Sequence, residues 1–239
     1  MAIEHSVQIL NFEYGYYFSP GFFSEYWLNY IQEKVEGHDS FASNKMKKYQ
    51  ELWVGSIFAA LYTKSTGEKY FVGLPEKDPP DVWLVRHVPI VRNGRECLKS
   101  ERIPVEITRC HLDKGEHLFT QISNKNKPSN DNFVLLVYLY GKGKTVSFTY
   151  LVEQIAKMDK IHPAEFFVIA KTYNCKDDNL KHNTFVGTMV YPEYRQQTVD
   201  LSDHDAFFKH PEVIRQKLGI SREVKMVGIR TLAPPNTNN

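Results

Sequence analysis

The sequence predicts a mixed α/β protein built around one main sheet. Two segments with helical spacing of apolar residues occupy the first quarter of the chain, and short runs rich in β-branched and aromatic residues follow them. Further along, two apolar runs flank another segment with helical spacing, which is the order of a strand–helix–strand crossover between parallel strands. These observations predict a mixed central sheet flanked by helices.

Composition is that of a folded chain with ordinary surface charge. The 239 residues are 42% hydrophobic, enough for one large domain or two small ones, and the formal net charge is +2. Positive and negative residues are interleaved, so any contact with nucleic acid must be local. No stretch approaches the roughly 18 apolar residues that a membrane span needs, and the three cysteines are far apart, so we expect a cytoplasmic protein without disulfides.

The first elements follow from aromatic and capping residues. Residues 1–18 are rich in aromatics and predict a strand or hairpin, and helical spacing continues over 21–36. A second helix is expected to begin after Ser43 or Asn44, either of which can cap it, and to end before Gly67.

Three predicted strands and a loop come next. The strands are 69–74, 82–91 and 103–110, each rich in β-branched or aromatic residues and bounded by Pro, Gly or Asn. Residues 112–132 are polar and predict a loop. The almost unbroken apolar run 133–140 predicts a central strand covered on both faces.

The last part of the chain predicts a helix, more strands and a final helix. Residues 148–158 show helical spacing and 166–172 indicate a buried strand, so this strand should lie parallel to the strand at 133–140. Strands are expected at 184–191 and 196–201, and an amphipathic helix at 203–218.

Acidic residues at three places on these elements suggest a metal site. Asp81 follows Pro80 at the start of a predicted strand, Glu106 lies in the middle of the next, and Glu51 lies on the preceding helix. The two-residue period turns Glu106 and Thr108 to the same face. Carboxylates on neighbouring strands can hold a hard cation such as Mg²⁺, which polarises a phosphate and lowers the pKa of a bound water.

This order of elements and acids, over roughly residues 44–172, resembles the restriction-endonuclease-like PD-(D/E)xK nuclease family. The resemblance implies that Asp81 and Glu106 bind Mg²⁺ or Mn²⁺ together with the carbonyl of Ile107, and that Glu51 supports the metal or its water. It also implies a restriction-endonuclease-like core at 44–175, with an N-terminal strand and helix extension at 1–43 and C-terminal strands and a helix, 176–239, packed on the core.

One position departs from the family pattern. The family's lysine, two residues after the second acid, orients the attacking water, and Thr108 stands there in this chain. Either another cation replaces it or catalysis is lost. Arg109 points to the wrong face of a regular strand, and the cations that could have migrated are Lys69, Arg86, Lys142 and Lys144.

Each of these residues also has a plainer interpretation. Asp81 after two prolines suits a turn, Glu106 suits an edge strand opposite an arginine, and Glu51 suits the first turns of a helix without any site. The Gly-Lys-Gly-Lys-Thr segment at 141–145 lacks the first glycine of a P-loop, because Tyr138 stands there, and indicates a basic turn.

Two further features have structural explanations. Cys110 and His111 are adjacent on a strand and point to opposite faces, which disfavours cysteine catalysis. The aromatic residues at 12–30 could stack on unpaired bases, but packing in the core or at a dimer interface accounts for them better.

The sequence therefore predicts a Mg²⁺-dependent endonuclease that hydrolyses phosphodiester bonds in DNA, with Asp81 and Glu106 as metal ligands, Glu51 and Thr108 beside them, and no membrane association. Two alternatives stay open. One is a catalytically inactive nuclease-fold subunit that binds or assembles with DNA, a protein partner or a second copy of itself. The other is an α/β interaction protein unrelated to nucleases.

Overall fold

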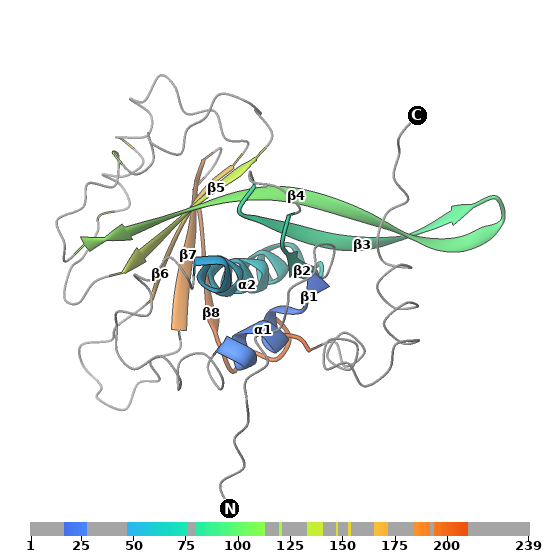
Figure 1. The fold of residues 1–239 in the computed structure, drawn as a ribbon, viewed down its shortest axis with the longest axis horizontal. Helices are drawn as coiled ribbons and strands as arrows, with labels where there is room; N and C mark the ends of the chain where they lie inside the picture. Colours follow the sequence, from blue (N-terminus) through green and yellow to red (C-terminus); the bar gives the residue numbers. More distant parts are fainter. Residues whose placement is uncertain are drawn as a thin grey trace, which may run out of the picture.

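The structure, a computed structural model, describes residues 17–27, 47–75, 80–112, 133–140, 165–171, 184–191 and 194–209, together with residues 120, 147 and 153. Within these residues the chain is a mixed α/β fold with one eight-stranded sheet curled around a central helix (Figure 1). The described part leaves out the predicted helix at 148–158 apart from residue 153, the segment 141–145, most of the loop at 112–132 and the first sixteen residues.

Two helices of the described residues lie between β1 and β2 in the chain. Helix α1, Pro20–Tyr26, begins with a proline, whose fixed φ and missing N–H suit the first turn of a helix. Helix α2, Lys47–Thr66, is followed by Gly67 at φ 75°, the left-handed conformation that commonly terminates a helix. This confirms the predicted end of the second helix.

The sheet follows the order of the chain. Its strands are β1 (Tyr17–Phe18), β2 (Tyr70–Gly73), β3 (Val82–Arg92), β4 (Arg95–His111), β5 (Val134–Tyr140), β6 (Glu165–Lys171), β7 (Thr184–Tyr191) and β8 (Arg195–Asp200). Strands β1 to β4 are antiparallel, β5 is parallel to β4, β6 is parallel to β5, and β7 and β8 are antiparallel again. The expected parallel pair, β5 with β6, is confirmed.

Strands β3 and β4 form one long hairpin, which the sequence prediction missed. The strand predicted at 103–110 begins at Arg95, and the connecting turn is Asn93-Gly94, with φ values of 53° and 72°. Two consecutive residues with positive φ match the twist of the flanking strands, and Asn-Gly is the pair that adopts this conformation most readily. Residues 95–102 lack a continuous apolar run, so periodicity alone did not reveal them.

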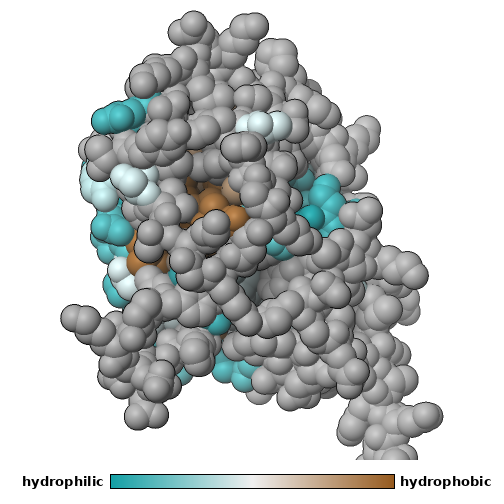
Figure 2. Space-filling view, turned by 90° about the vertical axis from the view of Figure 1, so that its left-hand side faces the viewer, coloured by the Kyte–Doolittle hydropathy of each residue, from teal (hydrophilic) through white to brown (hydrophobic). Residues whose placement is uncertain are grey.

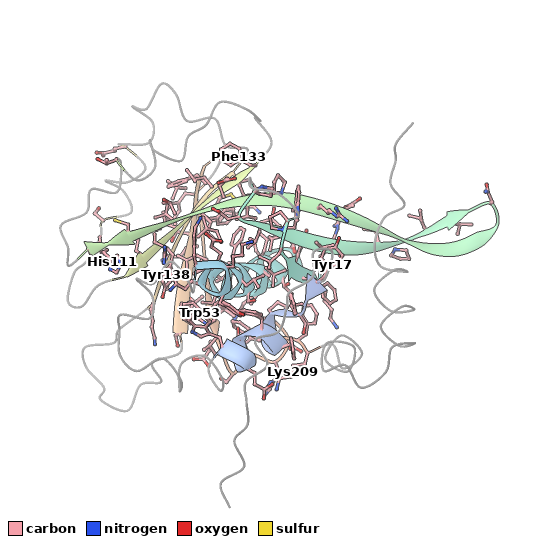
Figure 3. All side chains as sticks on the ribbon, in the orientation of Figure 1. Tyr17, Trp53, His111, Phe133, Tyr138 and Lys209 are labelled. Atoms are coloured by element: carbon pink, nitrogen blue, oxygen red, sulfur yellow. The ribbon has the colours of Figure 1, made fainter. Side chains whose placement is uncertain are left out.

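The curl of the sheet lets α2 serve as the centre of the core. Helix α2 contacts β2 and β3 at one end of the sheet and β7 and β8 at the other, and α1 packs against it as well. Trp53 of α2 meets Tyr138 of β5 edge to face, with ring centroids 5.8 Å apart (Figure 3). At Gly187 a Cβ would lie 2.6 Å from Leu61 Cδ1, so any larger residue at this position of β7 would require the Leu61 side chain to shift.

The C-terminal described residues correct a predicted helix. Residues 203–209 of the helix expected at 203–218 are not helical and contain a turn at 204–207, and the remainder of that segment lies outside the described part. Asp203 accepts a hydrogen bond from the Ala206 N–H (3.1 Å) and its carbonyl accepts one from the Phe207 N–H (2.7 Å), which closes a single turn. Phe208 then packs on Phe71. Tertiary contacts of this kind override the weak helix propensity of a local sequence.

The other face of the sheet carries a separate apolar cluster. It includes Cys110, Leu135, Val137 and Phe166, all on the side of β4, β5 and β6 away from α2. Among the coloured residues in Figure 2, apolar ones are visible near the centre of that face and hydrophilic ones farther out. Within the described ranges, no helix is both long and apolar enough to cross a membrane.

Candidate functional site

A group of polar side chains lies where the start of α2 meets β3 and β4. We call Lys47, Gln50, Glu51, Asp81 and Arg109 the Lys47 cluster. The Lys47 Nζ atom lies 3.3 Å from Glu51 Oε1 and 4.0 Å from Asp81 Oδ1, so one ammonium group contacts two carboxylates. The Asp81 and Glu51 side chains are 5% and 9% exposed, whereas that of Lys47 is 44% exposed. The cluster therefore joins buried carboxylates to a cation at the surface.

Asp81 is fixed by the backbone of β4. Its Oδ2 accepts a hydrogen bond from the Ile107 N–H at 2.7 Å, and its own N–H donates to the Val105 carbonyl at 3.1 Å. Pro80 before it has no N–H to offer. The Asp81 carboxylate thus takes the place of a main-chain acceptor for the Ile107 N–H, just before β3 begins. Its other oxygen, Oδ1, faces Lys47.

The Ile107 carbonyl belongs to the same side of β4. In a strand, the N–H and C=O of one residue point toward the same neighbouring strand. Because the Ile107 N–H points to Asp81, its carbonyl faces that side too. A buried carboxylate and a main-chain carbonyl, both hard oxygen donors, therefore lie on the same side of β4.

Helix α2 places Glu51 and Gln50 on the cluster. Glu51 follows Lys47 by four residues, which puts both on one face of the helix. Gln50 is 1% exposed, and its Oε1 accepts a hydrogen bond from Arg109 of β4. Arg109 is thereby held on the α2 side of the sheet.

Glu106 and Thr108 lie on the other face of β4. In the sheet register Glu106 is paired with Leu135 and Thr108 with Val137, and both partners belong to the cluster on the face away from α2. Ile107 instead packs in the core around α2. The structure thus brings Asp81 and Glu51 together at Lys47 and separates Glu106 and Thr108 from Glu51 by the thickness of the sheet.

The cations considered from the sequence have other contacts. Arg86 pairs with Glu101 across the hairpin at 2.5 Å, and the Lys69 Nζ lies 5.2 Å from the centre of the Phe208 ring. Lys142 and Lys144 lie outside the described residues. Sequence reasoning missed Lys47, although its position four residues before Glu51 on a predicted helix was a usable signal.

A second polar contact, near the other end of α2, is structural in character. The Tyr62 hydroxyl donates to the Glu165 carboxylate, at 3.2 Å from Oε1 and 3.1 Å from Oε2. Burial raises the pKa of Tyr62, and the nearby Glu165 raises it further. Burial likewise raises the pKa of Glu165, against the opposing effect of the Tyr62 hydrogen bond. The two groups satisfy each other beside the rings of Phe58 and Phe167.

The Lys47 cluster offers two carboxylates to a metal, not three. Within the described part of the chain, no three or more His, Cys, Asp or Glu residues are grouped closely enough to hold a metal ion. Mg²⁺, however, commonly uses one or two carboxylates and keeps several waters. Two buried carboxylates that already share a cation, beside a main-chain carbonyl, fit that requirement.

Comparison of the chain with protein-family models, curated proteins and solved structures finds no match.

Proposed function

We propose that this protein is a Mg²⁺-dependent nuclease that hydrolyses phosphodiester bonds in DNA at the Lys47 cluster. The observation that carries the proposal is the buried Asp81 carboxylate, which accepts the Ile107 N–H with one oxygen and faces the same ammonium group as Glu51 with the other. Asp81 and Glu51, with the Ile107 carbonyl, would hold the metal. Glu106, predicted as a ligand, lies on the far face of β4 from Glu51.

The order of elements supports this proposal. Helix α2 is followed by the antiparallel strands β2, β3 and β4 and then by β5, parallel to β4. Glu51 lies in α2, Asp81 precedes β3 and Glu106 lies in β4, which is the order on which the resemblance to the PD-(D/E)xK family depends. A bound Mg²⁺ would polarise the scissile phosphate and lower the pKa of a coordinated water.

Lys47 has the properties required of the missing lysine. Its side chain is long and 44% exposed, so its ammonium group can reach either the two carboxylates or a phosphate next to them. Next to a phosphate it would stabilise the negative charge that develops during hydrolysis. The guanidinium of Arg109, held by Gln50, adds a second positive charge on the same side of the sheet.

Metal binding and cleavage of plasmid DNA test the proposal together. We expect wild type to bind Mn²⁺ in calorimetric titration and to nick plasmid DNA with Mg²⁺ or Mn²⁺, and we expect Glu51→Gln/Asp81→Asn to lose both. The matched control is Glu68→Gln/Asp205→Asn, which removes two exposed carboxylates and should retain both. Wild type that neither binds metal nor nicks DNA would refute the nuclease proposal.

The alternative is a nuclease-fold subunit that binds DNA or assembles with a partner without cleaving. The separation of Glu106 and Thr108 from Glu51 favours it, because the acids implied by the family resemblance do not share one face. Duplex binding without metal binding, in both wild type and the carboxylate variant, would select this alternative.

Lys47→Met is expected to change metal binding and cleavage in opposite directions. Removing the ammonium group relieves its competition with a cation for Glu51 and Asp81, so the affinity for Mn²⁺ should rise severalfold. Cleavage should fall about 100-fold, because the charge next to the phosphate is gone. Titration and plasmid nicking measure the two effects, with Lys48→Met on the exposed side of α2 as the control. A fall in both, or in neither, would show that Lys47 does not take the role of the missing lysine.

A further inference from the structure

The hairpin of β3 and β4 extends well beyond the rest of the sheet (Figure 1). Strand β2 pairs with β3 only from Trp83 to Arg86, and β5 begins to pair with β4 at Val105. Residues 87–100 continue as six further register pairs and a turn, and no other described strand pairs with them. We call residues 87–100 the β-arm.

The dimensions of the β-arm match a groove of duplex DNA. Six pairs at the usual rise give a length of about 20 Å, and the two strands lie about 5 Å apart. The major groove, about 12 Å wide and 8.5 Å deep, admits a two-stranded ribbon of this kind. An isolated two-stranded ribbon is only marginally stable in water, so an element of this shape gains from a binding partner.

Charge along the β-arm favours a polyanion. The arm contains Arg92, Arg95 and Lys99 against Glu96, so three positive residues and one negative give it a net charge of +2, as large as that of the entire 239-residue chain. At its base, two positive residues are engaged with the protein. Arg86 pairs with Glu101, and Arg102 lies 5.6 Å from the centre of the Tyr17 ring.

The register concentrates positive charge at the tip. Arg92 and Arg95 form the last pair before the turn, directly opposite each other. Arginine makes charge-assisted hydrogen bonds with phosphate oxygens. Two arginines at the last register pair therefore make the tip the part of the β-arm best suited to a polyanion.

Other residues of the β-arm disfavour a second protein strand as its partner. Pro89 lies within β3 and has no N–H, and prolines occur in strands at edges where they block further pairing. Val91 near the tip is 74% exposed, the highest value among the large hydrophobic residues described. In a groove such a side chain can contact a thymine methyl group.

We propose that the β-arm inserts into the major groove of duplex DNA, with Arg92 and Arg95 contacting phosphates at the tip. This inference rests on the proposed function for its choice of DNA. The β-arm would bind the duplex while the Lys47 cluster hydrolyses a phosphodiester bond of the DNA backbone. Binding of DNA in the absence of divalent metal tests it separately from catalysis.

The expected result concerns affinity and its dependence on salt. With a fluorescent 30-base-pair duplex in EDTA, Arg92→Gln/Arg95→Gln should bind at least about tenfold more weakly than wild type, and the slope of log K against log salt should become shallower by about 2, because two phosphate contacts are lost. Arg92→Lys/Arg95→Lys should keep most of the slope. The control Lys64→Gln/Arg195→Gln removes two positive charges from exposed positions elsewhere and should bind as wild type does.

A measurement on unaltered protein covers the case in which the variants fail to fold. Trypsin cuts after arginine, and Arg92 and Arg95 flank an exposed turn, so the duplex should slow cleavage at both sites. Equal affinity of wild type and the glutamine variant, or cleavage at the turn unaffected by saturating duplex, would overturn the inference. Loss of dimers instead of loss of DNA binding in the variant would overturn it too and assign the β-arm to self-association.

These outcomes are distinguishable from failure of the proposed function. If wild type nicks plasmid and the β-arm variant binds DNA as tightly as wild type does, only the proposed role of the β-arm is refuted. A protein that binds duplex through the β-arm yet never nicks plasmid refutes the nuclease and leaves the arm in place.

Discussion

Asp81→Asn is expected to lower the rate of plasmid nicking about 100-fold or more while leaving the protein folded. The asparagine oxygen can still accept the Ile107 N–H, so the local hydrogen bond at 2.7 Å survives the substitution. What disappears is the negative charge that faces Lys47 and that a metal ion needs. The lost ion pair with a 44% exposed lysine is worth less than about 1 kcal/mol of stability.

The informative comparison is with Glu106→Gln. The sequence analysis predicted both Asp81 and Glu106 as metal ligands, whereas the sheet register places Glu106 beside Leu135, away from α2. We therefore expect Glu106→Gln to keep at least about a tenth of wild-type nicking and Glu51→Gln to fall as far as Asp81→Asn, because both would remove a carboxylate that binds the metal. Nicking that depends on Glu106 and not on Glu51 would move the metal site to the other face of β4.

Trp53→Ala is expected to destabilise the protein by about 3–5 kcal/mol, the usual cost of truncating a buried aromatic residue. Trp53 is 6% exposed, stacks on Trp27 with centroids 5.7 Å apart, and meets Tyr138 and Phe185 edge to face. It therefore connects α2 to the residue that ends α1 and to two strands, and its removal leaves a cavity between them. Figure 3 shows its place on α2 beside Tyr138.

Urea unfolding followed by circular dichroism would measure this loss, and the melting temperature should fall by roughly 10 °C. Tyr194→Ala is the matched control, because Tyr194 is 57% exposed and should change stability by no more than about 0.5 kcal/mol. Equal melting temperatures for both variants would show that Trp53 does not support the packing of α2 in the core.

Much of the secondary structure could be predicted because it depends on local patterns. The apolar run of β5 and the helical spacing of α2 record burial directly, and both elements were located to within a few residues. The beginning of β4 was missed because residues 95–102 have no continuous apolar run, although they pair with β3. The helix predicted at 203–218 begins instead with a turn, after which Phe208 packs on Phe71.

The candidate site shows the same division. A proline followed by Asp81 at the start of a strand, and Glu51 on the helix before it, were visible as isolated residues. Lys47 was not singled out, although its spacing from Glu51 is local. That this lysine also reaches Asp81 depends on how α2 crosses the start of β3, which is a long-range contact that no local pattern encodes.

By itself the sequence determined a mixed α/β chain, the parallel pair of β5 and β6, and a helix and strands carrying Glu51, Asp81 and Glu106. Those features follow from the periodicity of side chains along one element. Only the tertiary structure decided that the sheet curls around α2, that Asp81 meets Lys47 and Glu51, and that Glu106 lies on the opposite face. The physical reason is register, since shifting the pairing of a strand by one residue exchanges its two faces, and register is fixed by packing between distant segments.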